Sequence, residues 1–347
     1  MYYIKIFDNK HNILDEIHEF SGLTYTKTLN GVGKCEFSIP LNSFKCTKEN
    51  FTETNHVEIY RNDEKVWGGF IVQAEFNFPN LKIGCYGYLG IFMFRRLRAK
   101  DYVEQTYANL FKSLLVDINN ISSTGIIEGY FDSNSLRTQR KVENKDFALD
   151  KMLEYANSAN YYIEVNDDRE FNFYTVKERR LEYELIYGTE ESDNIINAPS
   201  LSRSILDMAN NVYAESEHEE EGVKTILTSL KQDANSINKY GLFEGVYNAN
   251  NDIVIQNTLD NYANDELSKR AYPSDTVSLK VANSNICPIH NLKVGDIIPI
   301  YLKPYFEYRD EVKILEITID VAKQEADVVV GQKLYKQQKP ITIIYAK

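Results

Sequence analysis

Three short polar stretches are the places where this sequence could carry chemistry. Gly31–Lys34 (GVGK) has the glycines and lysine of a phosphate loop, but it lacks the Gly-x-x-x-x-Gly-Lys-Ser/Thr spacing and precedes a strand pattern. The run ESEHEEE at Glu215–Glu221 offers carboxylates and His218 to a cation, but such charge runs usually form solvated hairpin tips. Asn166–Asp168 lacks the glycine and distal glutamate of a calcium loop. We interpret the first and third stretches as turns and the acidic run as the solvated tip of a hairpin.

The histidines and cysteines are too scattered to form a recognisable site. No histidine has a partner three or four residues away that would make a metal-binding pair; the five are His11, His18, His56, His218 and His290. The four cysteines contain no C-x-x-C pair: Cys35, Cys46, Cys85 and Cys287. No Gly-x-Ser-x-Gly elbow occurs. We therefore expect no catalytic residue, no cofactor-binding residue, no metal ligand and no enzymatic activity.

The charge balance argues against a surface that binds nucleic acid. The formal net charge of the 347 residues is −12, whereas affinity for phosphates requires concentrated lysine and arginine. One basic cluster comprises Arg95, Arg96, Arg98 and Lys100. It could be a nucleic-acid patch. We favour a join between two domains, or a contact with an acidic neighbouring subunit.

The N-terminal stretch MYYIKIFDNK predicts a first strand and not a signal peptide. No run approaches the roughly 20 apolar residues that a membrane span needs. We expect a chain that is made in a cytoplasm and has no membrane span.

The first part of the chain, residues 1–97, reads as β structure. In KCEFSIP, Cys35, Phe37 and Ile39 alternate with polar residues, which is typical of a half-buried strand. Gly68 and Gly69 lie inside another strand pattern and predict a bulge or a bend. Because such bends curl a sheet, we expect a small β-barrel domain here.

Residues 98–180 read as an α+β insert. The apolar residues of EQTYANLFKSLLVDINN follow helical spacing: Tyr107, Leu110, Phe111, Leu114, Leu115 and Ile118. A second helix is predicted over 146–158. Two strands then surround the turn at Asn166–Arg169.

Residues 181–335 read as a second β domain. We expect a hairpin with an acidic tip over 210–229, a third helix near 258–271 that ends at Pro273, and a last strand ending in VVVG. The tail 336–347 is a polar link followed by one apolar run, which could pair with another chain or with an outer strand. The predicted fold class is mainly β, with two similar small tube-like barrels and a helical and β insert.

The two β domains share an outline. In the first, Val57–Tyr60 leads through a turn to Phe70–Val72, then Leu81–Ile83, and ends at Gly87. In the second, the corresponding segments are Ile298–Tyr301, Val312–Ile314 and Val328–Val330, ending at Gly331. Three copies of a chain with two similar domains would present six similar surfaces, which suits a three-fold object that must bind a six-fold one.

The order of several motifs resembles the baseplate-hub or tail-tip hub family of tailed bacteriophages and contractile injection systems. The motifs are VWGGFIV, LKIGCYGYLGIFMFRRL, SINKYG, AYPSDTVSLKV and NLKVGDIIPIYL, with a helical insert after the second and a final VVVG. The resemblance covers roughly residues 1–335.

The resemblance implies a homotrimeric structural protein of the virion at the phage tail tip. Two domains per subunit would form a six-unit ring on the tail tube or distal tail protein ring. DNA would pass through a central channel without specific binding. The sequence stops at Lys347, so we expect the tip, spike, fibre or lysin to be a separate protein.

Two other functions stay open from the sequence. A receptor-binding or carbohydrate-binding tail protein would need an exposed aromatic shelf, for which the chain offers 25 tyrosines but one tryptophan. A cell-wall hydrolase has no positive signal in the motifs above.

Overall fold

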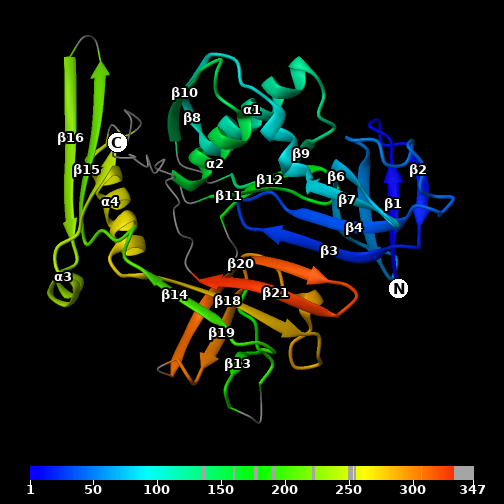
Figure 1. The fold of residues 1–347 in the computed structure, drawn as a ribbon. Helices are drawn as coiled ribbons and strands as arrows, with labels where there is room; N and C mark the ends of the chain where they lie inside the picture. The colour runs from blue at the N-terminus through cyan, green and yellow to red at the C-terminus, as the bar shows by residue number, and fades with distance from the viewer. Residues whose placement is uncertain are drawn as a thin grey trace, which may run out of the picture. The chain divides into compact units, whose positions relative to one another are not determined.

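The computed structural model describes residues 1–133, 137–158, 161–175, 179–189, 193–220, 223–248, 253, 255–305 and 307–331 (Figure 1). The chain forms two compact units. The first comprises Met1–Ser200 with Ser278–Val330, and the second comprises Leu201–Val277 with Gly331. Each unit is considered by itself. The tail predicted at 336–347 lies outside the described residues.

The first half of the main sheet consists of seven strands: β1 (Tyr2–Phe7), β2 (Ile13–Ile17), β3 (Ser21–Thr28), β4 (Lys34–Pro40), β5 (His56–Arg61), β6 (Glu64–Asn77) and β7 (Asn80–Gly87). Their order in the sheet is β3-β4-β7-β6-β5-β1-β2. The alternation predicted for β4 is confirmed, since Cys35, Phe37 and Ile39 are all buried.

The second half of the sheet consists of six strands: β13 (Leu185–Tyr187), β14 (Ser200–Ser204), β18 (Ser274–Ala282), β19 (Ile297–Leu302), β20 (Tyr308–Asp320) and β21 (Glu325–Gly331). Their order is β14-β18-β21-β20-β19-β13. The chain passes between its two units within β18, and the short 3-10 helix η2 (Ile289–Asn291) precedes β19.

The two halves form one sheet, which corrects the prediction of two separate barrels. Strand β3 of the first half pairs antiparallel with the far end of β20, from Thr28 opposite Glu316 to Thr24 opposite Asp320 (Figure 1). No pairing among the described residues closes either half on itself. The edge that would complete a first barrel is instead used to join the two halves. The chain is therefore mainly β, with a large antiparallel sheet.

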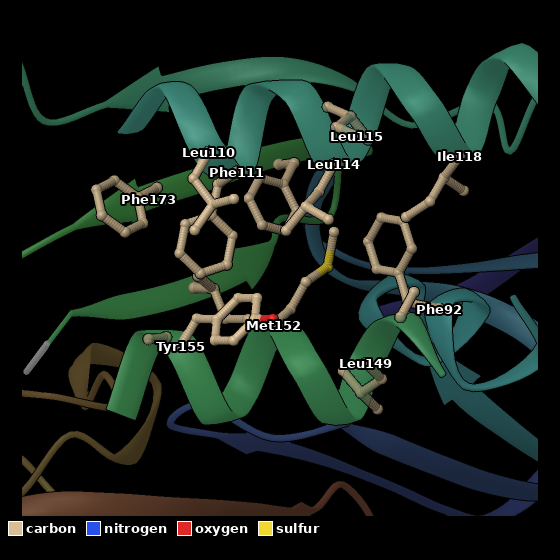
Figure 2. Close-up of a cluster of buried hydrophobic side chains, with 14 of the residues drawn as sticks. Phe92, Leu110, Phe111, Leu114, Leu115, Ile118, Leu149, Met152, Tyr155 and Phe173 are labelled. Carbon is tan, nitrogen blue, oxygen red and sulfur yellow. The ribbon is translucent and has the colours of Figure 1, made fainter. Parts of the chain in front are cut away.

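The insert between the two halves has its own core. Its elements are η1 (Tyr88–Phe94), β8 (Lys100–Thr106), α1 (Tyr107–Ile121), β9 (Ile127–Phe131), β10 (Arg137–Val142), α2 (Ala148–Ser158), β11 (Tyr162–Val165) and β12 (Glu170–Tyr174). Figure 2 shows Phe111 and Leu114 of α1 facing Met152 and Tyr155 of α2. These side chains are buried together with Phe173 of β12.

Helix α1 forms where its apolar stripe predicts it. The hydroxyl of Thr106 caps its first turn by accepting a hydrogen bond from the Asn109 N–H at 3.2 Å. Every residue of the predicted stripe is buried: Tyr107, Leu110, Phe111, Leu114, Leu115 and Ile118.

The second unit contains a long hairpin and two helices. Its elements are β15 (Asn211–Glu220), β16 (Val223–Gln232), α3 (Ala234–Tyr240), β17 (Glu244–Asn248) and α4 (Gln256–Arg270). The hairpin predicted over 210–229 is confirmed by the antiparallel pairing of β15 with β16. Ala214 of the hairpin packs with Leu259 and Ala263 of α4 in a small buried cluster.

The helices offer no route across a bilayer. Within the described ranges, none combines the length and the apolar character that a membrane-spanning helix requires.

The packing of the insert gives a first prediction. Phe111 is fully buried, and its ring centroid lies 4.9 Å from that of Phe173. Phe111→Ala leaves a cavity, so we expect the free energy of unfolding to fall by about 3–5 kcal/mol. Val116→Ala on the same helix removes a half-exposed side chain and should cost far less. Urea denaturation of both variants tests this, and equal losses would contradict the burial assigned to Phe111.

Candidate assembly interface

The loop Gly31–Lys34 is a turn, as predicted, and its glycines serve close packing. A Cβ on Gly33 would lie 2.5 Å from the carbonyl oxygen of Thr26. That same carbonyl accepts a hydrogen bond from the indole Nε1 of Trp67 at 3.3 Å. The loop thus lets β3 and β4 approach the single tryptophan, which is 2% exposed.

The turn at Asn166–Asp168 anchors the insert to the sheet. The Asp167 carboxylate accepts a hydrogen bond from the Gly68 backbone N–H at 3.1 Å and lies 2.7 Å from the Lys27 ammonium. A Cβ on Gly68 would lie 2.9 Å from the Asp167 carbonyl oxygen. The Gly68 position, predicted as a bulge or a bend, is therefore explained by the close approach of this turn, and register shifts in β6 flank it on both sides, at Lys65–Trp67 and at Ile71–Gln73.

A buried carboxylate strengthens this anchor. Glu58 of β5 has a side chain only 3% exposed, and the Lys65 ammonium lies 3.1 Å from it and 2.7 Å from the Asp168 carboxylate. The Tyr60 hydroxyl also donates to Glu58, at 2.7 Å. Burial alone would lower the pKa of Lys65, but its bonds to Asp168 and Glu58 raise that pKa, so the ammonium stays charged. Lys65 thus links the sheet to the insert.

The basic cluster also serves the insert. The Arg95 guanidinium donates to the carbonyl oxygens of Ile118 and Ser122, at 3.1 and 2.6 Å, and so caps the end of α1. The Lys100 ammonium lies 2.6 Å from the Asp117 carboxylate on the same helix. These contacts favour the join between domains over a nucleic-acid patch.

The acidic run Glu215–Glu220 lies within strand β15 and not at a hairpin tip, which corrects the interpretation from the sequence. Two of its carboxylates bond within the hairpin. Glu217 pairs with Lys224 across the hairpin at 2.7 Å, and Glu215 accepts a hydrogen bond from the Tyr213 hydroxyl at 2.7 Å. The tip at 221–222 and the side chain of His218 lie outside the described residues. Within the described part of the chain, no three His, Cys, Asp or Glu side chains converge as metal ligands would.

Two histidines come together in a way that their spacing does not predict. The rings of His11 and His56 meet edge to face with centroids 5.2 Å apart, and His11 Nε2 lies 3.5 Å from Glu58. Burial, followed by the charges of His11 and Arg169, lowers the pKa of His56 to about 4. Burial also lowers the pKa of His11. The folded protein therefore holds His56 as a neutral ring near neutral pH.

Two cysteines also become neighbours. Cys35 of β4 lies directly opposite Cys85 of β7, and both are free and buried. Burial raises the pKa of the Cys35 thiol well above its usual range, which keeps it protonated and unreactive.

The largest feature of the molecule is a duplicated strand order. The order β3-β4-β7-β6-β5-β1 in the first half matches β14-β18-β21-β20-β19-β13 in the second. In each half, a connection of similar length separates the second strand from the next in the chain, at 41–55 and at 283–296. One difference is that β1 runs antiparallel to β5, whereas β13 runs parallel to β19. The repeat predicted from the sequence outline is thus present as six strands in the same order.

Individual backbone bonds repeat as well. Ile71 donates to Asn55 at 2.9 Å and accepts from Thr54 at 2.8 Å, while Ile314 makes the same two bonds, each 2.8 Å long, with Asp296 and Gly295. Thr54 and Gly295 both have left-handed backbone conformations, with φ of 76° and 90°. The same local geometry is therefore built twice, and at Thr54 a residue other than glycine adopts it.

The anchor between insert and sheet gives a second prediction. Asp167→Ala removes the acceptor of the Gly68 N–H and the partner of Lys27, so we expect a loss of about 1–3 kcal/mol in the free energy of unfolding. Asp168→Ala removes only a carboxylate that is 67% exposed and should cost less than about 1 kcal/mol. Chemical denaturation compares the two variants, and equal stabilities would show that Asp167 does not anchor the insert.

The neutral His56 gives a third prediction, on pH. The folded protein holds the pKa of His56 at about 4, below the ordinary histidine value of 6.5, so between these values the unfolded chain binds more protons and stability falls as pH decreases. His56→Gln should remove up to about 3 kcal/mol of that fall. The exposed His18→Gln should keep the wild-type slope. Denaturation midpoints from pH 7 to 4 measure the slopes, and identical slopes for all three proteins would refute the assignment.

Comparison with known proteins places the chain in a family. A family model described as YQBQ-like matches residues 23–306. No curated protein sequence matches. The fold is similar to that of prophage tail protein gp18 from Listeria monocytogenes EGD-e, with 14% identity, TM-score 0.67 and coverage of 95% of this chain and 94% of that one. It is similar to a tail protein from Neisseria meningitidis MC58, with 10% identity, TM-score 0.68 and coverage of 96% and 97%.

A third similar structure comes from a secretion system. The Escherichia coli c3393 protein has 9% identity, TM-score 0.53 and coverage of 91% of this chain and 74% of that one. It is described as a component of the type VI secretion system with structural similarity to the T4 bacteriophage tail proteins gp27 and gp5. The predicted resemblance to phage tail proteins is confirmed. The chain belongs to the YQBQ-like family and has the fold of phage tail proteins.

Proposed function

We propose that the protein is a structural hub of a phage tail tip or baseplate, acting as a homotrimer that joins a six-fold tail tube to a three-fold tip. The observation that carries this proposal is the duplicated strand order, β3-β4-β7-β6-β5-β1 and β14-β18-β21-β20-β19-β13. Three copies of such a chain supply six similar surfaces, so each subunit of a six-fold ring meets an equivalent partner.

The similar structures support the same role. Two of them are described as tail proteins, and the third as a secretion-system component with structural similarity to phage tail proteins. In this proposal the chain keeps three domains, at 1–97, 98–180 and 181–335, with a tail at 336–347. All strands of the first half of the sheet fall in the first domain, and those of the second half fall in the third.

The proposed mechanism is mechanical and involves no bond chemistry. The ring surrounds a central channel, and the net charge of −12 suits a wall along which DNA slides without binding. One face binds the tail tube or the distal tail protein ring. The other carries a separate tip, spike, fibre or lysin protein. The protein would accordingly be a component of the virion tail tip, assembled in the host bacterial cytoplasm.

The mass of the purified protein in solution tests the proposal. We expect a particle with the mass of three chains, because subunits of a permanent assembly typically bury over roughly 2,000 Å² per interface. Light scattering after gel filtration measures this mass over a range of concentrations. A dimer would contradict the proposal, because two copies supply only four of the six similar surfaces.

A further inference from the structure

The two halves of the sheet differ in what covers one edge of their longest strand. In the second half, β20 pairs with β19 over Tyr308–Lys313 and then, along the same edge, with β3 over Glu316–Asp320. In the first half, β6 pairs with β5 only as far as Phe70. Among the described residues, no strand lies along the rest of that edge.

The open segment of β6 corresponds to the covered segment of β20. The shared backbone bonds of Ile71 and Ile314 fix the alignment, so Gln73–Asn77 matches Glu316–Asp320. The Leu41 N–H donates to the Pro79 carbonyl oxygen, so the backbone carbonyl of Pro79 faces β4. The backbone groups of the next residue, Asn80, therefore face β6, where Asn80 lies opposite Asn77. Along a strand, the backbone N–H and C=O groups of successive residues point alternately to one neighbouring strand and to the other. Since the groups of Asn77 face β7, those of Ala74 and Phe76 point away from β7, to the open edge.

Side-chain exposure marks the same difference. Phe76 is 78% exposed, whereas Ile319, at the matching position of the covered strand, is 4% exposed. Phe78, in the turn that follows β6, is 92% exposed. Aromatic side chains at the end of an unpaired strand edge indicate a surface that is covered in an assembly.

Strand β14 has an edge on which no other strand pairs within the described residues. By position in the duplicated order, β14 is the counterpart of β3. Strand β3 pairs with β4 on one side and with β20 on the other, whereas β14 pairs within the described residues only with β18, where Arg203 contacts Asp275 at 2.7 Å. Leu206, just after β14, is 91% exposed. Within the described residues, one chain therefore carries a strand with one free edge, β14, and an open edge on β6, the same two kinds of edge that β3 and β20 join inside the chain.

We propose that β14 of one copy pairs antiparallel with Gln73–Asn77 of β6 in the next copy, as β3 pairs with Glu316–Asp320 within one chain. This inference rests on the proposed function, because it specifies how the ring closes. The contact is head to tail, since each copy offers a different element to each neighbour. The β3–β20 pairing within a chain and the β14–β6 pairing between chains then alternate around the ring. Both pairings have the same geometry, so every half of a sheet meets its neighbours in the same way.

Cross-linking between two marked copies tests this pairing. In a Cys46→Ser background, full-length chains with Glu75→Cys are co-expressed with chains carrying Ser202→Cys; both positions are exposed. Cys46 is the one native cysteine that is not buried. A short bifunctional maleimide should join one copy of each kind. The matched control replaces Ser202→Cys with Asn264→Cys, which is exposed on α4, and should give at least a tenfold lower yield.

A backbone variant tests the same edge without cross-linking. Ala74→Pro removes an N–H that points to the open edge, where proline is tolerated within the chain. We expect this variant to be a single chain in solution in place of the three-chain particle. The thermal unfolding midpoint of the variant should match that of an isolated wild-type chain. Glu75→Ala, which keeps every backbone donor, should stay assembled.

The outcomes separate this inference from the proposed function. A three-chain particle that gives no cross-link above the Asn264→Cys control, and that stays assembled with Ala74→Pro, overturns the strand pairing and leaves the hub proposal standing. Single chains at every concentration overturn both. Cross-linked pairs from a three-chain particle that Ala74→Pro separates support both.

Discussion

The backbone pairing of β3 with β20 is the constraint on which the rest of the structure depends. It joins strands from opposite ends of the chain, and the hydroxyls of Thr26 and Thr318 meet there at 2.8 Å although 292 positions separate them. Because this pairing uses the edge that could have closed a barrel, each half of the sheet stays open. The joint also fixes how one copy of a six-strand pattern sits beside the other. If the same joint recurs between chains, the duplicated order becomes a ring.

A few charged residues hold the insert against the sheet. Asp167, Asp168 and the buried Glu58 surround Lys27 and Lys65 where the β11–β12 turn meets β5 and β6. Leaving a buried carboxylate unpaired costs more than an exposed pair gains, so the network favours one position of the insert. A carboxylate cluster with a nearby histidine could be mistaken for a catalytic centre. Here its polar atoms bond to backbone and lysine groups of the joint, which explains its presence without chemistry.

The local patterns of the sequence predicted local structure well. Helix α1 followed from the spacing of Leu110, Phe111 and Leu114, because helical periodicity depends only on residues one turn apart. The choice of strand partners could not be predicted in this way, so the prediction of two separate barrels was wrong. Period-two alternation indicates which face of a strand is buried, but not which strand lies at its edge. The anchor at Glu58 was missed too, although a glutamate inside HVEIY and the Gly68–Gly69 pair were signals that another segment packs closely there.

In the proposed assembly, the two halves of each chain take equivalent places around a common axis. An electron cryomicroscopy reconstruction of the assembled particle, viewed along that axis, measures this directly. We expect six similar sheets, two from each chain, at equal radius around an open axial hole. Halves at different radii, or an axis filled by protein, would contradict it.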